Sequence, residues 1–550
     1  MSSEAHPPPS LPAQDPFPPA RHAALARARD AYQYDFSYGE QCFVRDLPAA
    51  EHFPPPYLAT AAEISAALAA NRAAATVGAR PAPEGDSLEP YRRMFPLLRA
   101  PRALEHWKED WCFGWQRLAG PCPVVLQRLE ALPAHLPIAD AHLERALGRP
   151  GAFVPAALTE GRLYVADYAA FAGLRGGATD GRRKYVSAPV ALFLAHPGGL
   201  APVAIQIEGH AGGAATLVGP TEGARWMLAR TVVQAMDESH QGVITHVGLC
   251  HMVIQRFILA ARRQLAPWHP LLRLLAPHFE NTLAVNQVAR DSVLSVGGSQ
   301  DRLLAPVIED QLALLTRRVA EVDLASLDPT VELARRGVHD PESLPMYPFR
   351  DDSLPIFQAT HDFAREYLAL YYPSDSDVAA DTELAAFVAE VGAPGGGRLP
   401  RMMAGVRVAT TADVTSLVAR ILFRATTFHA AINDASYDWV AFAPNMPCAA
   451  FAPFPSPGAP IGADAHARML PTVALGWEVV SATYNVAEIG KNRLGRYAEG
   501  HFGDERVPPV VARFQERLRA IEADTVARNR RRPLPYEYLL PSRITASING

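Results

Sequence analysis

The stretch THVGLCHMVIQRF, residues 245–257, places two histidines five positions apart in a mostly apolar segment. Buried histidines are uncommon unless their ring nitrogens have partners. On a regular α-helix five residues turn through about 500°, which leaves His246 and His251 roughly 140° apart and unable to share an ion. A π-helical turn, with hydrogen bonds from residue i to i+5, brings them nearly into register. The spacing therefore indicates either a metal site on a distorted helix or two unrelated core histidines.

A second pair of candidate ligands lies in the stretch ATTFHAAIND, where His429 and Asn433 stand four positions apart. That spacing places both side chains on one face of a predicted helix. Three imidazoles and an amide oxygen suit an intermediate metal such as iron better than calcium or magnesium. Zinc hydrolase chemistry fits poorly, because there is no H-E-x-x-H motif and Gln255 stands where a helical acid would be needed. His240 and Cys250 miss the ligand spacing or the ligand face, so we exclude them as ligands.

The composition excludes several functional classes. The 550 residues are 49% hydrophobic and 20% charged, which is ordinary for a globular protein with a large core. The 52 basic and 57 acidic residues form no basic block interleaved with aromatics, so we expect no nucleic-acid partner. The five cysteines are scattered and contain no C-x-x-C pair, which fits a reducing compartment rather than a disulfide scaffold.

The sequence also predicts where the protein acts. Its start has no apolar signal region, and it has no uninterrupted apolar run of about 18 residues, the length that spans a bilayer. We therefore expect a cytoplasmic protein with at most peripheral membrane contact. We expect a monomer.

Periodicity predicts a mainly α fold: a proline-rich flexible tail over residues 1–20, then one large helical domain over 21–550 with a small β element. The β element consists of the strands YVSAPVALFLA and LAPVAIQI, joined by a Pro-Gly-Gly turn within residues 185–208. The clearest helical stretches are 60–76, 221–241, 355–372, 412–433 and 511–529.

The segment HVGLCHMVIQRFILAARRQLAPWHPLLRLLAPHFENTLAVN, residues 246–286, strongly resembles the iron-binding helix of lipoxygenases and the chain that follows it. That family carries H-x4-H, then a basic helix end, then a pattern of the type HP…LL.PH…T..(I/V)N. Further segments are similar to lipoxygenase motifs: WCFGWQRLAGPCP, APVALFLAHPGGLAPVAIQI, YPFRDDSLPIFQATHDFAREYLALYYPSDSDVAADTELAAFVAEV, FHAAINDASYDW and PYEYLLPSRITASING. The resemblance runs from about residue 105 to the last residue.

The resemblance implies one non-haem iron per chain. Its ligands by position are His246, His251, His429, Asn433 and the main-chain carboxylate of Gly550. An iron-bound hydroxide would take a hydrogen atom from a cis,cis-1,4-pentadiene of a polyunsaturated fatty acid, and O2 would add to the radical to give a lipid hydroperoxide. No side-chain acid or base is needed for this chemistry. We expect a bacterial-type, single-domain form that lacks the family's N-terminal β-barrel.

The same resemblance implies roles for four residues of NTLAVNQVARDSVL. Ala289 occupies the position where lipoxygenases carry Ala or Gly, and Ala implies mainly S hydroperoxides. Val293 stands where a bulky Leu commonly shapes the oxygen side of the pocket. Arg290 and Leu294 are candidate substrate contacts, and Arg290 is equally well explained as a structural helix-end residue.

Besides Val293, the chain departs from the family at Gly550 and Ser436. Gly550 replaces the usual terminal Ile, and a glycine tail costs roughly 1 kcal/mol more to order. Ser436 stands where the family often has a Gln near the metal, which changes a group that orients ligands. The altered surroundings at Ser436 and Val293 keep open a fatty-acid hydroperoxide isomerase or epoxyalcohol synthase on the same iron. An inactive lipid-binding relative is the other alternative.

Overall fold

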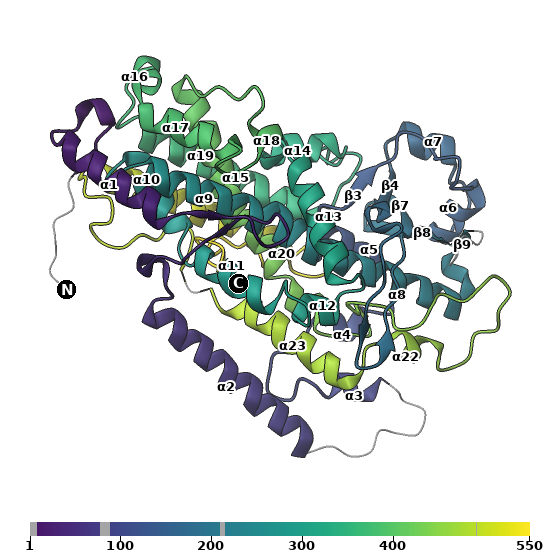
Figure 1. Ribbon diagram of the computed structural model, residues 1–550. Helices are drawn as coiled ribbons and strands as arrows, with labels where there is room; N and C mark the ends of the chain where they lie inside the picture. Colours follow the sequence, from purple (N-terminus) through teal and green to yellow (C-terminus); the bar gives the residue numbers. More distant parts are fainter. Residues whose placement is uncertain (1–7, 78–87, 209–214, 491, 550) are drawn as a thin grey trace.

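The computed structural model describes residues 8–77, 88–208, 215–490 and 492–549. A continuous helix of 41 residues runs through the middle of the molecule (Figure 1). It consists of α8 (Ala224–Ser239), the π-helix η6 (His240–Met252) and α9 (Val253–Gln264). Its length and hydropathy would suit a membrane span, but 83% of its apolar window is buried inside the protein. It is therefore the core helix of this fold.

The other helices surround this core helix, with α13 against η6 and α17 against α9 (Figure 1). The remaining helices of ten residues or more are α1 (Pro18–Ala31), α2 (Pro55–Val77), α5 (Asp110–Ala119), α11 (Thr282–Ser292), α13 (Ile308–Glu321), α15 (Pro348–Leu368), α17 (Thr382–Gly392), α19 (Thr411–Phe423), α23 (Val473–Glu488) and α24 (Val507–Asn529). Shorter helices include α3 (Glu89–Arg92), α4 (Ala103–His106), α6 (Asp140–Leu147), α7 (Val154–Thr159), α10 (Pro270–Leu275), α12 (Ser299–Leu303), α14 (Pro329–Arg335), α16 (Asp375–Ala380), α18 (Pro400–Met403), α20 (His429–Asn433), α21 (Ser436–Val440) and α22 (Ala465–Met469). The predicted mainly α fold is confirmed.

The β element is an antiparallel five-stranded sheet in the order β3-β4-β7-β8-β9. Its strands are β3 (Leu126–Arg128), β4 (Leu163–Asp167), β7 (Val190–His196), β8 (Gly199–Ile207) and β9 (Thr216–Val218). The predicted hairpin is β7–β8. Phe193 belongs to the main core and contacts Phe113 of α5, whereas Leu192 and Leu194 belong to a second cluster that includes residues of α6 and α7. Because both faces are covered, the strand reads as a continuous apolar run.

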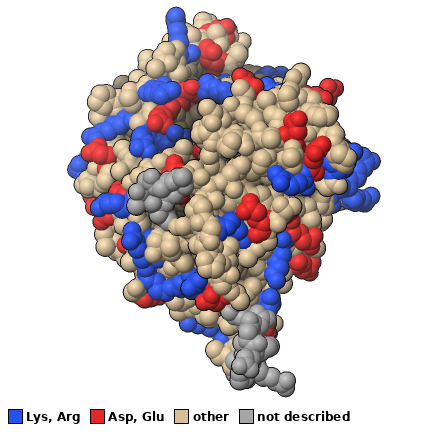
Figure 2. All heavy atoms as spheres, turned by 90° about the vertical axis from the view of Figure 1, so that its right-hand side faces the viewer, with Lys and Arg blue, Asp and Glu red and all other residues tan. Residues whose placement is uncertain are grey.

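Four further short strands form two hairpins, β1 (Tyr34–Asp35) with β2 (Phe43–Val44) and β5 (Ala178–Thr179) with β6 (Arg182–Arg183). The face of the molecule that carries the large sheet shows acidic and basic side chains interspersed around a broad uncharged area (Figure 2). Helix α2, predicted from its alanine-rich sequence, lies along the outside of the molecule beside α23 (Figure 1).

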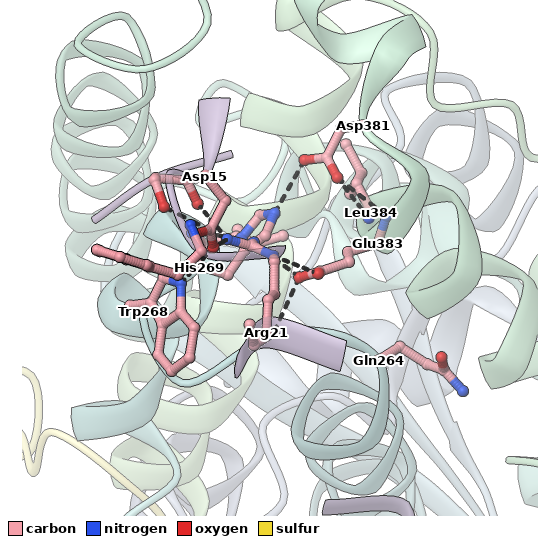
Figure 3. A network of polar contacts seen from close by, with 12 residues as sticks. Asp15, Arg21, Gln264, Trp268, His269, Asp381, Glu383 and Leu384 are labelled. Atoms are coloured by element: carbon pink, nitrogen blue, oxygen red, sulfur yellow. Dashed lines mark hydrogen bonds and ion pairs between the residues drawn. The ribbon is translucent and has the colours of Figure 1, made fainter. Parts of the chain in front are cut away.

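Residues 8–20, predicted to belong to a flexible tail, have defined contacts with the helical core, whereas residues 1–7 lie outside the described residues. The guanidinium of Arg21 lies 2.7 Å from the Asp15 carboxylate and donates two hydrogen bonds, of 2.5 and 2.9 Å, to the carboxylate of Glu383 (Figure 3). The Trp268 indole also donates to Asp15, at 2.7 Å. All three charged groups are buried. Such pairs are costly to break, so this contact fastens the N-terminal segment to the first turn of α17, and Trp268 joins it to the loop after α9.

Candidate metal centre

The π-helix η6 brings the two histidines of the opening motif together. The Nε2 atoms of His246 and His251 lie 3.1 Å apart, and their ring centroids are 4.6 Å apart. The i to i+5 hydrogen bonding of η6 produces this register, as the spacing required. Gly248 lets α13 approach this segment, because an added Cβ would meet Leu315 Cδ1 at 2.8 Å. The segment that forms the π-helix thus also contains the glycine that allows α13 to pack closely against it.

His429 enters the same cluster from a second distorted helix. Helix α19 continues into the π-helix η9 (Arg424–Phe428), and His429 begins α20 directly after it. Thr426 within η9 donates its hydroxyl hydrogen to the carbonyl of Leu422 at 2.7 Å, a contact that commonly bends helices. The Nε2 atoms of His246 and His429 lie 3.3 Å apart. The ring nitrogens that the three histidines offer all lie within 4.8 Å of one another.

The protonation state of His246 suits metal binding. Burial, together with the charges of His251 and His429, lowers the pKa of His246 well below its ordinary value. The imidazole of His246 is therefore neutral at physiological pH and presents a lone pair to an ion. Among the described residues, the group that could hold a metal contains these three histidines and no cysteine or carboxylate.

Asn433 contributes a buried oxygen on the same helix as His429. Its Nδ2 donates to the carbonyl of Val486 at 2.8 Å and to the carboxylate of Asp434 at 3.1 Å. Both amide hydrogens are therefore used, and the Oδ1 atom is buried without a hydrogen-bond partner. A buried acceptor of this kind requires an explanation, and a cation provides one. The three imidazoles and this oxygen together fit a metal such as iron.

The C-terminal segment lies beside this part of the site. Asn549 and Thr545 line a small pocket together with His429 and Asn433. Ile548 is fully buried, and its carbonyl accepts a hydrogen bond from the hydroxyl of Thr282 at 3.2 Å. Gly550, the predicted fifth ligand, lies outside the described residues. Ile548 therefore anchors this segment in the apolar core.

Further hydrogen bonds fix the segment against α11 and the loop before it. His278 Nδ1 lies 2.7 Å from the carbonyl of Ala546. Asn281 donates to the Oδ1 of Asn549 at 3.1 Å, and the amide of Asn549 donates to Asn492 at 2.6 Å. The buried end of the chain is thus held by side chains on both sides.

A hydrogen bond that we did not predict from the sequence holds His251 at Nδ1, the ring nitrogen opposite the one that faces His246. Its Nδ1 lies 2.7 Å from Oδ1 of Asn286, on α11. The amide of Asn286 donates to Gln255, and the amide of Gln255 donates to the main-chain carbonyl of Cys42. The signal in the sequence was the asparagine that closes the family pattern, residue 286, directly after the run TLAV at the start of α11.

The predicted pocket residues lie further along α11 and just beyond it. Ala289 follows Asn286 by three positions and precedes Val293 by four, which places all three on one side of the helix. Ala289 and Val293 are half-buried. Leu294 is buried, and its carbonyl accepts a hydrogen bond from the hydroxyl of Tyr38 at 2.7 Å. Their roles towards substrate stay predictions.

Arg290 faces acidic and aromatic neighbours. Its Nε donates to Asp291 at 2.8 Å, and its Nη1 lies 3.9 Å from a carboxylate oxygen of Asp35. The guanidinium also lies 5.8 Å from the ring centroid of Phe43. These contacts favour the structural interpretation of Arg290, and its contact with a substrate carboxylate stays a prediction.

The two residues excluded as ligands, and Ser436, make other contacts. His240 Nδ1 lies 3.3 Å from the sulfur of Cys122. The thiol of Cys250 donates to the carbonyl of Arg424 at 3.4 Å. The Ser436 hydroxyl, at the start of α21, donates back to the carbonyl of Ile432 in α20 at 3.3 Å. A Gln at position 436 would extend beyond this local bond, so the substitution shortens the polar reach at this position.

Comparisons with known proteins match this chain to lipoxygenases and their relatives. The family model described as Lipoxygenase matches residues 95–535. A Pseudomonas aeruginosa protein described as a linoleate 9/13-lipoxygenase is 36% identical over 488 residues, which cover 85% of this chain and 70% of the relative. A human protein described as the hydroperoxide isomerase ALOXE3 is 32% identical over 451 residues, covering 81% of this chain and 63% of that protein.

The fold agrees as well. A crystal structure of a lipoxygenase variant in complex with arachidonate matches with a TM-score of 0.89 and 25% identity, covering 98% of this chain and 83% of that one. The match includes the helical body and extends over almost the whole chain. With its histidine cluster on two π-distorted helices, the chain belongs to the lipoxygenase family of dioxygenase enzymes.

Proposed function

We propose that this protein is a non-haem iron dioxygenase that inserts O2 into cis,cis-1,4-pentadiene units of polyunsaturated fatty acids and releases lipid hydroperoxides. The observation that carries the proposal is the convergence of three imidazoles with the partnerless buried oxygen of Asn433. The ligands we assign to the iron are His246, His251, His429, Asn433 and the carboxylate of Gly550. Bound iron would supply the one-electron oxidation of the doubly allylic C–H bond.

The protein's own residues then have to orient the substrate and limit the access of oxygen. We assign the apolar walls to Val293 and Leu294, close to the half-buried Ala289. No side-chain acid or base is required of the chain, which agrees with a histidine group that includes no carboxylate among the described residues. A dry, apolar surrounding limits side reactions of the substrate radical.

Oxygen uptake with linoleate and with arachidonate tests the proposal directly. We expect uptake with at least one of them, formation of a conjugated diene hydroperoxide, and about one iron per chain by metal analysis. A protein that is active with stoichiometric zinc and without iron would contradict the assignment. An inactive lipid-binding relative would bind the fatty acid without consuming oxygen.

The second candidate is a hydroperoxide isomerase on the same iron, favoured by the 32% identity to the human hydroperoxide isomerase. The same assay separates the two functions. An isomerase converts added fatty-acid hydroperoxide to an epoxyalcohol without net oxygen uptake, whereas a dioxygenase consumes oxygen with the unoxidised fatty acid.

Replacing Ala289 with Gly is expected to change product chirality. The Ala methyl group blocks oxygen from one end of the pentadiene, so the native protein gives mainly S hydroperoxides. Gly opens that end, and we expect the ratio of S to R products to fall by at least about tenfold, equivalent to roughly 1.4 kcal/mol between two transition states. Chiral chromatography of the products measures the ratio.

Ala284→Gly is the matched control. Ala284 lies on the same helix, and its replacement introduces the same helix-weakening glycine. It should lower stability by about 1 kcal/mol without altering chirality. Mainly R products from the native protein, or unchanged position and chirality in Ala289→Gly, would show that Ala289 does not control oxygen access.

A further inference from the structure

A chain of hydrogen bonds links the carbonyl of Cys42 through Gln255 and Asn286 to His251, and this relay has a fixed direction. The main-chain carbonyl of Cys42 can only accept a hydrogen bond, so Gln255 presents its NH2 group to it. The Oε1 of Gln255 then faces Asn286 and accepts from the NH2 group of that residue. This leaves the Oδ1 of Asn286 facing His251, 2.7 Å from Nδ1. Each amide orientation therefore follows from the carbonyl at the far end.

The direction of the relay determines the tautomer of the histidine. Because the oxygen of Asn286 is an acceptor, Nδ1 of His251 carries the proton and donates it. In the neutral imidazole the Nε2 atom is then unprotonated and directs its lone pair towards His246 and the rest of the cluster. A neutral histidine with this proton arrangement is ready to bind a metal.

Burial removes water as a substitute for the relay. Asn286 and Cys42 are fully buried, Gln255 is 1% exposed and His251 is 5% exposed. The relay also joins three parts of the fold: Gln255 follows His251 by one turn on the core helix, Asn286 lies on α11, and Cys42 directly precedes β2. A cut in the relay would therefore leave buried polar groups unsatisfied rather than rehydrated.

We propose that Asn286, held in its orientation by Gln255, is a positioning residue that fixes the tautomer and ring orientation of His251 for metal binding. The proposal rests on the proposed iron centre. It assigns the two amides a role beyond packing, because the second nitrogen of a ligating imidazole sets both its orientation and its basicity. It also ties α11, which carries Ala289, to a metal-binding side chain.

The primary test is Asn286→Leu, which keeps the approximate size of the side chain and removes the acceptor. Iron(II) affinity, measured anaerobically by competition with a chelator, is expected to fall by about 10- to 100-fold. The electron paramagnetic resonance spectrum of the ferric form should change as well. Asn286→Asp keeps an acceptor facing His251 but sets its second oxygen against the Oε1 of Gln255, so we expect it to recover part of the affinity.

Asn445→Leu is the matched control. Asn445 is also a buried amide, exchanging hydrogen bonds with Gln116 at 2.9 and 3.0 Å and donating to the carbonyl of Trp439 at 2.6 Å. It lies outside the histidine cluster, so its loss should reduce stability and leave iron affinity and the spectrum unchanged.

The outcomes separate this inference from the proposed function. A native protein that binds no iron contradicts the iron centre itself. A native protein that binds iron, with Asn286→Leu showing the same affinity and spectrum, overturns the positioning role alone. If Asn286→Leu does not fold, Gln255→Met cuts the relay one step further from His251, and a native spectrum and affinity in that variant would equally overturn it.

Discussion

His251→Ala is expected to abolish iron binding and oxygen uptake together. The substitution removes one of the three imidazoles whose nitrogens converge within 4.8 Å, and it leaves the acceptor of Asn286 unsatisfied in the core. Loss of a ligand should cost more than the roughly 10- to 100-fold that removal of a supporting partner costs, so we expect iron below detection in the purified variant. Metal analysis and oxygen uptake with linoleate measure the two effects.

His240→Ala is the control for the loss of a half-buried imidazole from the same π-helix. Its Nδ1 contacts the sulfur of Cys122 and the hydroxyl of Thr245, and the ring lies outside the metal-binding group. We expect this variant to lose about 1–3 kcal/mol of stability and to keep its iron. Stoichiometric iron and native turnover in His251→Ala would remove His251 from the ligand set.

The spacing of His246 and His251 predicted the distorted helix η6, but nothing in the sequence predicted the second distorted helix, η9. Two histidines five apart make sense for one ion only on a π-turn, and η6 has this geometry. Nothing comparable marked η9, because His429 and Asn433 are four apart and both lie on the regular turn after the distortion. Residue types within the distorted turn, such as Thr426, are too common to identify it from sequence.

Contacts between segments far apart in the chain could not be predicted from the sequence either. His251 and Asn286 are 35 positions apart, and Arg21 and Glu383 are 362 apart, so periodicity along the chain contains no information about either pair. Proline-rich composition predicted a flexible tail before residue 20. The buried carboxylate of Asp15 shows that a few specific ion pairs can order such a segment.

Adding residues after Gly550 is expected to eliminate activity and most of the bound iron. The neighbouring chain is rigidly placed: Ile548 is fully buried, and the carbonyl of Asn549 accepts a hydrogen bond from the hydroxyl of Tyr57 at 2.9 Å. Asn549 also borders the pocket that contains His429 and Asn433. An extension replaces the terminal carboxylate with a neutral peptide bond, removing the one negatively charged ligand that we assign to the iron.

A short C-terminal tag, compared with the same tag before Met1, isolates this effect from a general effect of tagging. Iron content should fall in parallel with oxygen uptake in the C-terminally tagged protein, and both should remain native in the N-terminally tagged one.

The addition of a single Gly distinguishes displacement of the carboxylate from steric crowding by a tag. Adding one Gly supplies little bulk but still moves the carboxylate by about 3.3–3.6 Å, the span of one extended residue, which exceeds the length of a metal–oxygen bond. A single added Gly should therefore be nearly as damaging as the full tag. If the tagged protein keeps full rate and iron content, Gly550 is not a ligand, and the metal is held by the histidines and Asn433 alone.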